Sequence, residues 1–302
     1  MGRPPLPARP VGAALRLLVL GPLALAAGAV FLILTLFADA TDDLFAWRMS
    51  PVTATLLGAG YGGSGVMLAL ALRARRWEKV RVTTAASSLF MLLMLGASLL
   101  GRRSLHLTGG PPPAVAAAWI WLGVHLAAPL LGLIALGAQW RVTGAKPPRA
   151  PRLPWWVAAP ILSSGLTVTA TGLLLYALPD QAARHWPWTA RPLDVRALGA
   201  WCLAFGIALL LGWREAELRR VRHGMAALVV SGLLGLTGLL RYGGRIDWDG
   251  PGSWLVVLVL AAFIGLGLSG AGVSVLFDPP EPETGPQVQL QDSAGVRPAR
   301  PA

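Results

Sequence analysis

His125 lies near the midpoint of a long apolar run, where an ionisable side chain is costly and therefore suggests a function. In a helix, Trp121 and Pro129 fall one turn away from it on the same face. Proline has no N–H group, so Pro129 leaves the carbonyl of His125 without its helical donor. The imidazole and this carbonyl indicate a ligand-binding site inside the apolar run. The alternative is a structural histidine, buried and hydrogen-bonded to a neighbouring helix.

A second group of candidate residues follows the first apolar run, in a short acidic and aromatic segment. It contains Asp39, Asp42, Asp43 and Trp47, and a later segment around Trp188 is also aromatic. If both segments lie on one face of the protein, they are placed to line the mouth of a cleft. The alternative is that they are helix caps and interface anchors, because tryptophan prefers the headgroup region of a membrane. The tryptophans near the ends of apolar runs are Trp47, Trp77, Trp140, Trp155, Trp156, Trp186, Trp188, Trp213, Trp248 and Trp254.

Glycines cluster between Gly58 and Gly65 and twice match the GxGxxG pattern of dinucleotide-binding proteins. That pattern has meaning only between a strand and a helix, whereas this one lies inside an apolar run, so we expect no cofactor. Spacings typical of metal ligands do not occur either, and we expect no metal. Small residues one turn apart instead let two helices approach closely. We therefore predict close helix packing at Gly58, Gly62, Gly65, Gly199 and Gly206.

The composition is that of an integral membrane protein. The chain of 302 residues is 55% hydrophobic and only 13% charged, whereas soluble domains carry about 25% charged residues. Its net charge of +12 comes mainly from arginines grouped between the apolar runs, which is typical of membrane topology and not of nucleic-acid binding. We therefore expect the lipid bilayer, and no nucleic acid, as a partner.

Eight apolar segments reach the roughly 20 residues that a helix needs to cross a bilayer. Lys and Arg are more than twice as frequent on one side of these segments, the side of both termini, which predicts cytoplasmic termini. The arginine-rich, alanine-rich composition further indicates a bacterial cytoplasmic (inner) membrane. The predicted spans are residues 17–38, 52–72, 82–100, 114–138, 155–178, 195–213, 224–240 and 253–277, of which the seventh is the shortest.

The two halves of the chain align without a gap when Trp47 is placed on Trp188. The same shift places Asp39 on Asp180 and Pro51 on Pro192, and such matches are rarer in an apolar chain than matches of leucine or alanine. They predict an internal duplication. A repeat with four spans inserts the same way up each time, so we predict two parallel tandem four-helix repeats. The predicted parts are a cytoplasmic segment (1–16), the first repeat (17–140), a basic Pro-rich cytoplasmic linker (141–154), the second repeat (155–277) and a disordered cytoplasmic tail (278–302).

Two resemblances bear on function. The stretch Leu44-Phe-Ala-Trp47, together with Pro51 and Leu57-Gly-Ala-Gly-Tyr61, resembles uncharacterised multi-pass membrane proteins of actinobacteria, which implies no activity. The helix count and the parallel repeat also resemble haem A synthase, a family that relies on intramembrane histidine pairs in both halves. This chain departs from that pattern, because His106, His185 and His223 fall outside the apolar runs.

These observations favour a non-catalytic inner-membrane protein that binds a partner or a ligand. The partner could be another protein or a second copy of the chain. One alternative is a transporter or permease for an uncharged or lipophilic solute, which a cavity between the halves would favour. A proton- or sodium-coupled mechanism is disfavoured because no apolar segment carries Asp, Glu or Lys near its centre. The other alternative is a membrane enzyme that binds haem or a quinone.

Overall fold

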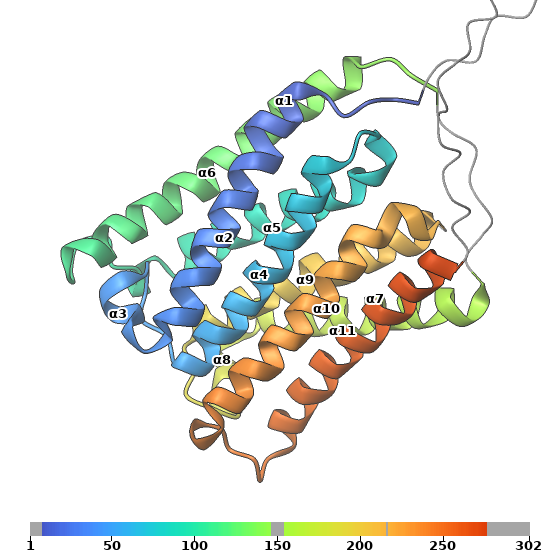
Figure 1. Ribbon diagram of the computed structural model, residues 1–302. Helices are drawn as coiled ribbons and strands as arrows, with labels where there is room; N and C mark the ends of the chain where they lie inside the picture. The colour runs from blue at the N-terminus through green and yellow to red at the C-terminus, as the bar shows by residue number, and fades with distance from the viewer. Residues whose placement is uncertain (1–7, 146–153, 216, 277–302) are drawn as a thin grey trace, which may run out of the picture.

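The described part of the chain forms one bundle of eight long helices, in which successive helices run in opposite directions (Figure 1). The computed structural model describes residues 8–145, 154–215 and 217–276, and no β-strand occurs among them. All eight helices are long and apolar enough to cross a membrane, which confirms that part of the sequence prediction. They are the continuous helix α1–η1–α2 (Ala13–Leu36), α4 (Pro51–Arg73), α5 (Arg81–Leu100), α6 (Pro112–Arg141), α7 (Trp155–Ala177), α9 (Pro192–Glu215), α10 (Leu218–Arg241) and α11 (Pro251–Leu276).

Short helical turns join the long helices on the side opposite α1. They are η2 (Ala38–Ala40) and α3 (Thr41–Leu44) after α2, α8 (Pro179–Arg184) after α7, η4 (Arg102–Ser104) after α5 and η5 (Gly243–Arg245) after α10. On the side of α1, η3 (Trp77–Lys79) leads into α5. The predicted tail 278–302 lies outside the described residues, as does most of the linker 141–154.

The prediction that the seventh span is the shortest is wrong. Helix α10 begins at Leu218, several residues before the predicted start, and α5 is shorter than α10. The charged first turn of α10 was excluded by the apolar-run criterion, yet a helix can begin with charged residues where it leaves the hydrocarbon region. Arg220 is buried there and forms ion pairs with Glu215 and Glu217.

The centre of the bundle is formed by the four most buried helices, α4, α5, α9 and α10. Helix α4 packs against α2 and α10, and α9 packs against α7 and α5. Glycines occupy the close approaches, since a Cβ at Gly58 would lie 2.9 Å from Thr35 of α2 and one at Gly62 would lie 2.6 Å from Leu234 of α10. The tightest approach of α4 to α10 is at Gly63, where a Cβ would overlap Ser231.

Two further glycines allow α9 to pack closely against α7. A Cβ at Gly199 would lie 2.7 Å from the backbone of Tyr176 in α7, and one at Gly206 would overlap Thr169 of the same helix. Gly65 has only ordinary contact, 3.9 Å from Ala27. Four of the five glycines singled out from the sequence therefore lie where a side chain would separate two helices.

Helix α6 contacts α5 but stands apart from α2 along its middle. It meets α1 and η1 near one end and α3 near the other, and has few contacts with α2 between them (Figure 1). Gln139 fastens the first of these ends, because its side-chain oxygen accepts from the N–H of Gly12 at 2.7 Å and its nitrogen donates to the carbonyl of Pro10 at 2.9 Å. Held at its two ends, α6 leaves a gap beside α2.

Candidate functional site

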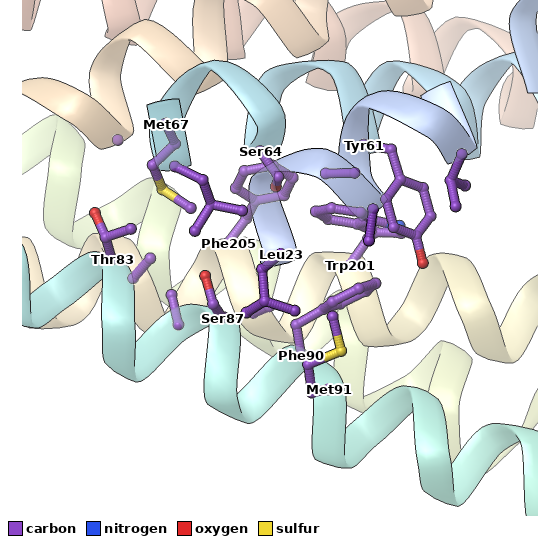
Figure 2. A pocket seen from close by; sticks show the side chains of 18 of the residues that line it. Leu23, Tyr61, Ser64, Met67, Thr83, Ser87, Phe90, Met91, Trp201 and Phe205 are labelled. Atoms are coloured by element: carbon purple, nitrogen blue, oxygen red, sulfur yellow. The ribbon is translucent and has the colours of Figure 1, made fainter. Parts of the chain in front are cut away.

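A largely apolar cavity of about 270 Å³ lies within the bundle, between α2, α4, α5, α6, α9 and α10. Both halves of the chain contribute to its wall, and Figure 2 shows the side chains from α4, α5 and α9 that face one another across it. The cavity extends from Phe45, after α3, to Arg220, in the first turn of α10. It therefore covers much of the depth of the bundle.

Aromatic rings gather at one end of this cavity. Tyr61 of α4, Phe90 of α5 and Trp201 of α9 face one another in Figure 2. Their centroids lie 5.1 Å apart for Tyr61–Trp201, 5.8 Å for Tyr61–Phe90 and 4.1 Å for Phe90–Trp201. Trp121 of α6 joins the group, 6.2 Å from Tyr61. Such offset and edge-on contacts favour the binding of a further flat ring.

His125 also lies in the cavity wall, next to Trp121, with the two ring centroids 4.2 Å apart. Its Nδ1 is 2.8 Å from the carbonyl oxygen of Trp121. A carbonyl only accepts, so Nδ1 carries the proton and the Nε2 of the neutral ring is an acceptor. The prediction that a structural His125 would bond to a neighbouring helix is wrong, because the observed bond lies within α6. It is Trp121 that reaches another helix, since its Nε1 donates to Ser98 of α5 at 2.9 Å.

Pro129 does not line the cavity, although it lies within α6 one turn after His125. The structure thus brings together two members of the predicted group, His125 and Trp121, and leaves the third outside. Sequence reasoning missed Tyr61 and Trp201. The signal that identified His125, a hydrogen-bonding group far inside an apolar run, applies to both of them and could have found them.

Three polar atoms in the cavity wall have no hydrogen-bond partner among the described residues. They are the Oη of Tyr61, the Nε2 of His125 and the Nε1 of Trp201, and all three are buried. An unpartnered buried donor or acceptor costs about 1–3 kcal/mol. Unsatisfied hydrogen-bonding groups from α4, α6 and α9 are therefore concentrated in one wall of the cavity, near the middle of these three helices.

The opposite end of the cavity is also polar. Thr83 and Ser87 of α5 lie there (Figure 2), followed by Arg220 of α10. Arg220 is already paired with Glu215, which also pairs with Arg81. Arg220 also pairs with Glu217, so two glutamates balance the two arginines at this end. Among the described lining residues, no other charged side chain occurs.

The predicted acidic loop does not line the cavity. Asp39 accepts from the hydroxyl of Tyr242 at 2.8 Å and pairs with Arg245 at 3.0 Å, both from the second half. Burial and the hydrogen bond to Asp39 raise the pKa of the Tyr242 phenol. Asp42 pairs with His106 at 3.2 Å, and Asp43 is exposed. These carboxylates hold the connections between helices together on the side opposite α1.

Trp47 and Trp188 are buried, only 1% and 6% exposed, so the prediction that they are interface anchors is wrong. The Nε1 of Trp47 donates to the carboxyl group of Asp194 at 2.9 Å, and the Nε1 of Trp188 donates to the hydroxyl of Thr53 at 2.9 Å. Each indole thus reaches the first turn of a helix in the other half. An indole needs one acceptor, and these buried side chains supply it as well as a headgroup would. Trp140 and Trp155, in contrast, are mostly exposed at helix ends.

Asp194 and Thr53 have a second role, at the starts of α9 and α4. Asp194 accepts from the backbone N–H of Arg191 at 2.9 Å, and Thr53 is bonded to Ser50, the residue before α4. Both therefore fix the beginning of their own helix while holding an indole from the other half. The two bonds tie the halves together near the connections opposite α1.

No protein-family model, no curated protein and no solved structure matches the chain. In the described residues, no group of three or more His, Cys, Asp or Glu side chains is arranged to hold a metal ion. The cavity and its wall are therefore the basis for a functional assignment.

Proposed function

We propose that this is a non-catalytic integral membrane protein that binds a lipophilic ligand in the cavity between its two halves. The observation that carries the proposal is the cavity itself, about 270 Å³ in volume and largely apolar. Small-molecule sites are commonly concave, mostly apolar and provided with a few polar groups that orient the ligand. The cavity has these properties, with its polar groups at the two ends.

Access from the bilayer supports a lipophilic ligand. The gap between α2 and α6 borders the cavity, and Ala29 of α2 and Ile120 of α6 are both lining residues and exposed. These residues lie in membrane-spanning helices, so what meets them outside the protein is lipid. A ligand dissolved in the acyl-chain region can therefore enter sideways, without crossing the connections that close the bundle.

The polar groups of the wall favour binding over catalysis. Among the described lining residues they are hydroxyls, indoles, one imidazole and one arginine, with no carboxylate. General acid–base and nucleophilic catalysis usually need a nucleophile or base oriented by a second group. His125 is oriented only by a backbone carbonyl. We therefore infer that the ligand is held unchanged.

Transport of the same class of ligand is a second candidate. The cavity extends from Phe45 near one face to Arg220 near the other, and such a path would suit a carrier that moves a lipophile between leaflets. A transporter must open alternately to the two sides, whereas a binding protein need not. Movement of a fluorescent lipophile between the leaflets of vesicles containing the protein would favour this candidate.

We also propose that the halves are parallel repeats, with 155–277 duplicating 17–140 across the linker 141–154. The shift that places Trp47 on Trp188 also places Thr53 on Asp194, so the two cross-half bonds join equivalent positions. It superposes the start of α4 on that of α9, and η4 on η5. A twofold axis along the bundle would account for this exchange.

The proposed topology places both termini in the cytoplasm of a bacterium, with the protein in the inner membrane. The excess of Lys and Arg on the side of α1 supports this orientation. Reporter fusions after Arg81, Arg152 and the C-terminus should all report a cytoplasmic location. A periplasmic location at any of these three sites would contradict the topology.

The binding proposal is tested by filling the cavity. Ala86 of α5 is buried in the wall, whereas Ala116 of α6 is exposed and does not line the cavity. We expect wild-type protein, purified from membranes, to carry a lipophile that mass spectrometry of the organic extract detects. Ala86→Phe should lose it and Ala116→Phe should retain it. Ala208→Phe fills the cavity from α9, in case Ala86→Phe does not fold. The same extract composition in all four proteins would contradict the proposal.

A further inference from the structure

The aromatic end of the cavity defines the head group of the ligand, an inference that rests on the proposed binding function. Three unpartnered polar atoms, from Tyr61, His125 and Trp201, lie in this part of the wall. Each belongs to a different helix, so local irregularity of one segment does not explain why all three lack hydrogen-bond partners. A ligand that bonds to them restores hydrogen bonds that the protein alone leaves unmade.

The hydrogen-bonding character of the three atoms is set by their chemistry. The Nε1 of Trp201 can only donate, and the hydroxyl of Tyr61 can donate or accept. The Nε2 of His125 can only accept while the ring is neutral, because the carbonyl of Trp121 holds the proton at Nδ1. These three side chains of the wall therefore carry at least one unused donor and one unused acceptor. A group that both donates and accepts, which is what a hydroxyl does, matches this pair.

We propose that the ligand is a lipophile with a hydroxyl on an aromatic ring, that is, a phenol or hydroquinone head with an apolar tail. The hydroxyl donates to His125 and accepts from Trp201 or Tyr61. An oxidised quinone or a ketone offers acceptors only, and so leaves the Nε2 of His125 without a partner. The ring lies among Tyr61, Phe90, Trp121 and Trp201, which an aliphatic alcohol would use less well.

The remaining wall suits the tail. Leu23 of α2 and Met67 of α4 line the cavity beyond the aromatic group, and Met91 of α5 lies beside Phe90 (Figure 2). Methionine is flexible and adapts to apolar groups of different shape. The three polar atoms are not exposed to the cavity, so binding requires a side-chain rotation, a change that is common when partners bind.

Three matched probes separate the contributions of the hydroxyl. They are para-nonylphenol, its methyl ether para-nonylanisole, which accepts but does not donate, and nonylbenzene, which does neither. Dissociation constants are measured by isothermal titration of the full-length protein in one detergent. Because the probes partition differently into micelles, each dissociation constant is corrected for the measured partition of its probe. The corrected constants are compared between wild type, His125→Phe and Tyr61→Phe. His185→Phe is the control, since His185 is exposed on the short helix turn after α7 and does not line the cavity.

We expect wild type to bind the phenol about fivefold to tenfold more tightly than the ether. In His125→Phe this preference should fall to about one, because the acceptor is gone, while in His185→Phe it should persist. Tyr61→Phe, which removes only a hydroxyl, should weaken the phenol and leave nonylbenzene unchanged; it tests the site independently if His125→Phe does not fold. Equal binding of all three probes to wild type, lost in Ala86→Phe, would overturn the hydroxyl-bearing ligand and leave the binding function intact. No saturable binding of any probe would overturn both.

Discussion

The fourth long helix of each half, α6 in the first and α11 in the second, is placed very differently. Helix α11 packs closely along α10, the helix before it, whereas α6 has far fewer contacts with α5 and leaves a gap beside α2. A Cβ at Gly232 of α10 would lie 2.7 Å from the backbone of Leu260 in α11, and one at Gly267 would lie 2.6 Å from that of Met225. The glycines Gly123 and Gly137 of α6 have no neighbour within 4 Å.

The comparison shows that a glycine allows close helix packing in a membrane only where it faces a partner helix. Helices in lipid gain little from burying apolar surface, so their association depends on close packing. On α10 and α11 the small residues face the partner helix and allow this packing. On α6, Gly123 and Gly137 have no neighbouring helix within contact distance, while α5 presents Phe90 and Met91 to the cavity. Helix α11 is thus packed closely on α10, whereas α6 leaves the cavity open beside α2.

The largest expected effect comes from breaking the closed side. Gly232→Leu would force α11 away from α10 and should lower the free energy of unfolding by about 1–3 kcal/mol, as overpacking does. Gly123→Leu, on the exposed side of α6, is the matched control and should change it little. Thermal unfolding of both variants in one detergent gives the comparison. Equal losses would show that α6 also packs through its glycines.

A smaller and unequal effect is expected at the two cross-half indoles. Trp47→Phe removes a donor to a carboxyl group and should cost about 2 kcal/mol if Asp194 is ionised, whereas Trp188→Phe removes a donor to a hydroxyl and should cost about 1 kcal/mol. The loss of ring area is the same in both. Trp140→Phe, at a position 74% exposed, is the control. A larger loss of stability in Trp188→Phe than in Trp47→Phe would contradict the prediction that the bond from Trp47 to Asp194 is the stronger of the two.

The smallest effect is expected at Gln139, which bonds the end of α6 to Pro10 and Gly12. Gln139→Leu keeps the side-chain volume but leaves the N–H of Gly12 and the carbonyl of Pro10 without their partner. Because Pro10 is exposed and Gly12 half-buried, water can replace part of these bonds, and the cost should be about 1 kcal/mol. Hydrogen exchange should become faster at Gly12 and the last turns of α6, and should remain unchanged in α11. Uniform protection in both helices would mean that Gln139 does not hold α6 in place.

The sequence predicted the eight helices because each apolar run is long enough to cross a membrane and is bounded by arginine, proline or tryptophan. It also located His125 and most of the glycines that lie at close approaches. It could not predict the cavity, because Tyr61, Phe90 and Trp201 come from helices far apart in the chain. The burial of Trp47 and Trp188 was also missed, because an indole near a helix end can bond either to headgroups or to a buried side chain.

The central claim is that the cavity between the two halves, beside α6, holds a lipophile, whereas the close contact of α10 with α11 leaves no comparable site. Cryo-electron microscopy of the protein extracted with its native lipids into nanodiscs tests this claim most directly. We expect elongated density that belongs to no side chain beside Tyr61, His125 and Trp201, continuing to the gap between α2 and α6. No such density should lie between α10 and α11. A cavity filled by repacked side chains, with α6 closed against α2 and α5, would contradict the account.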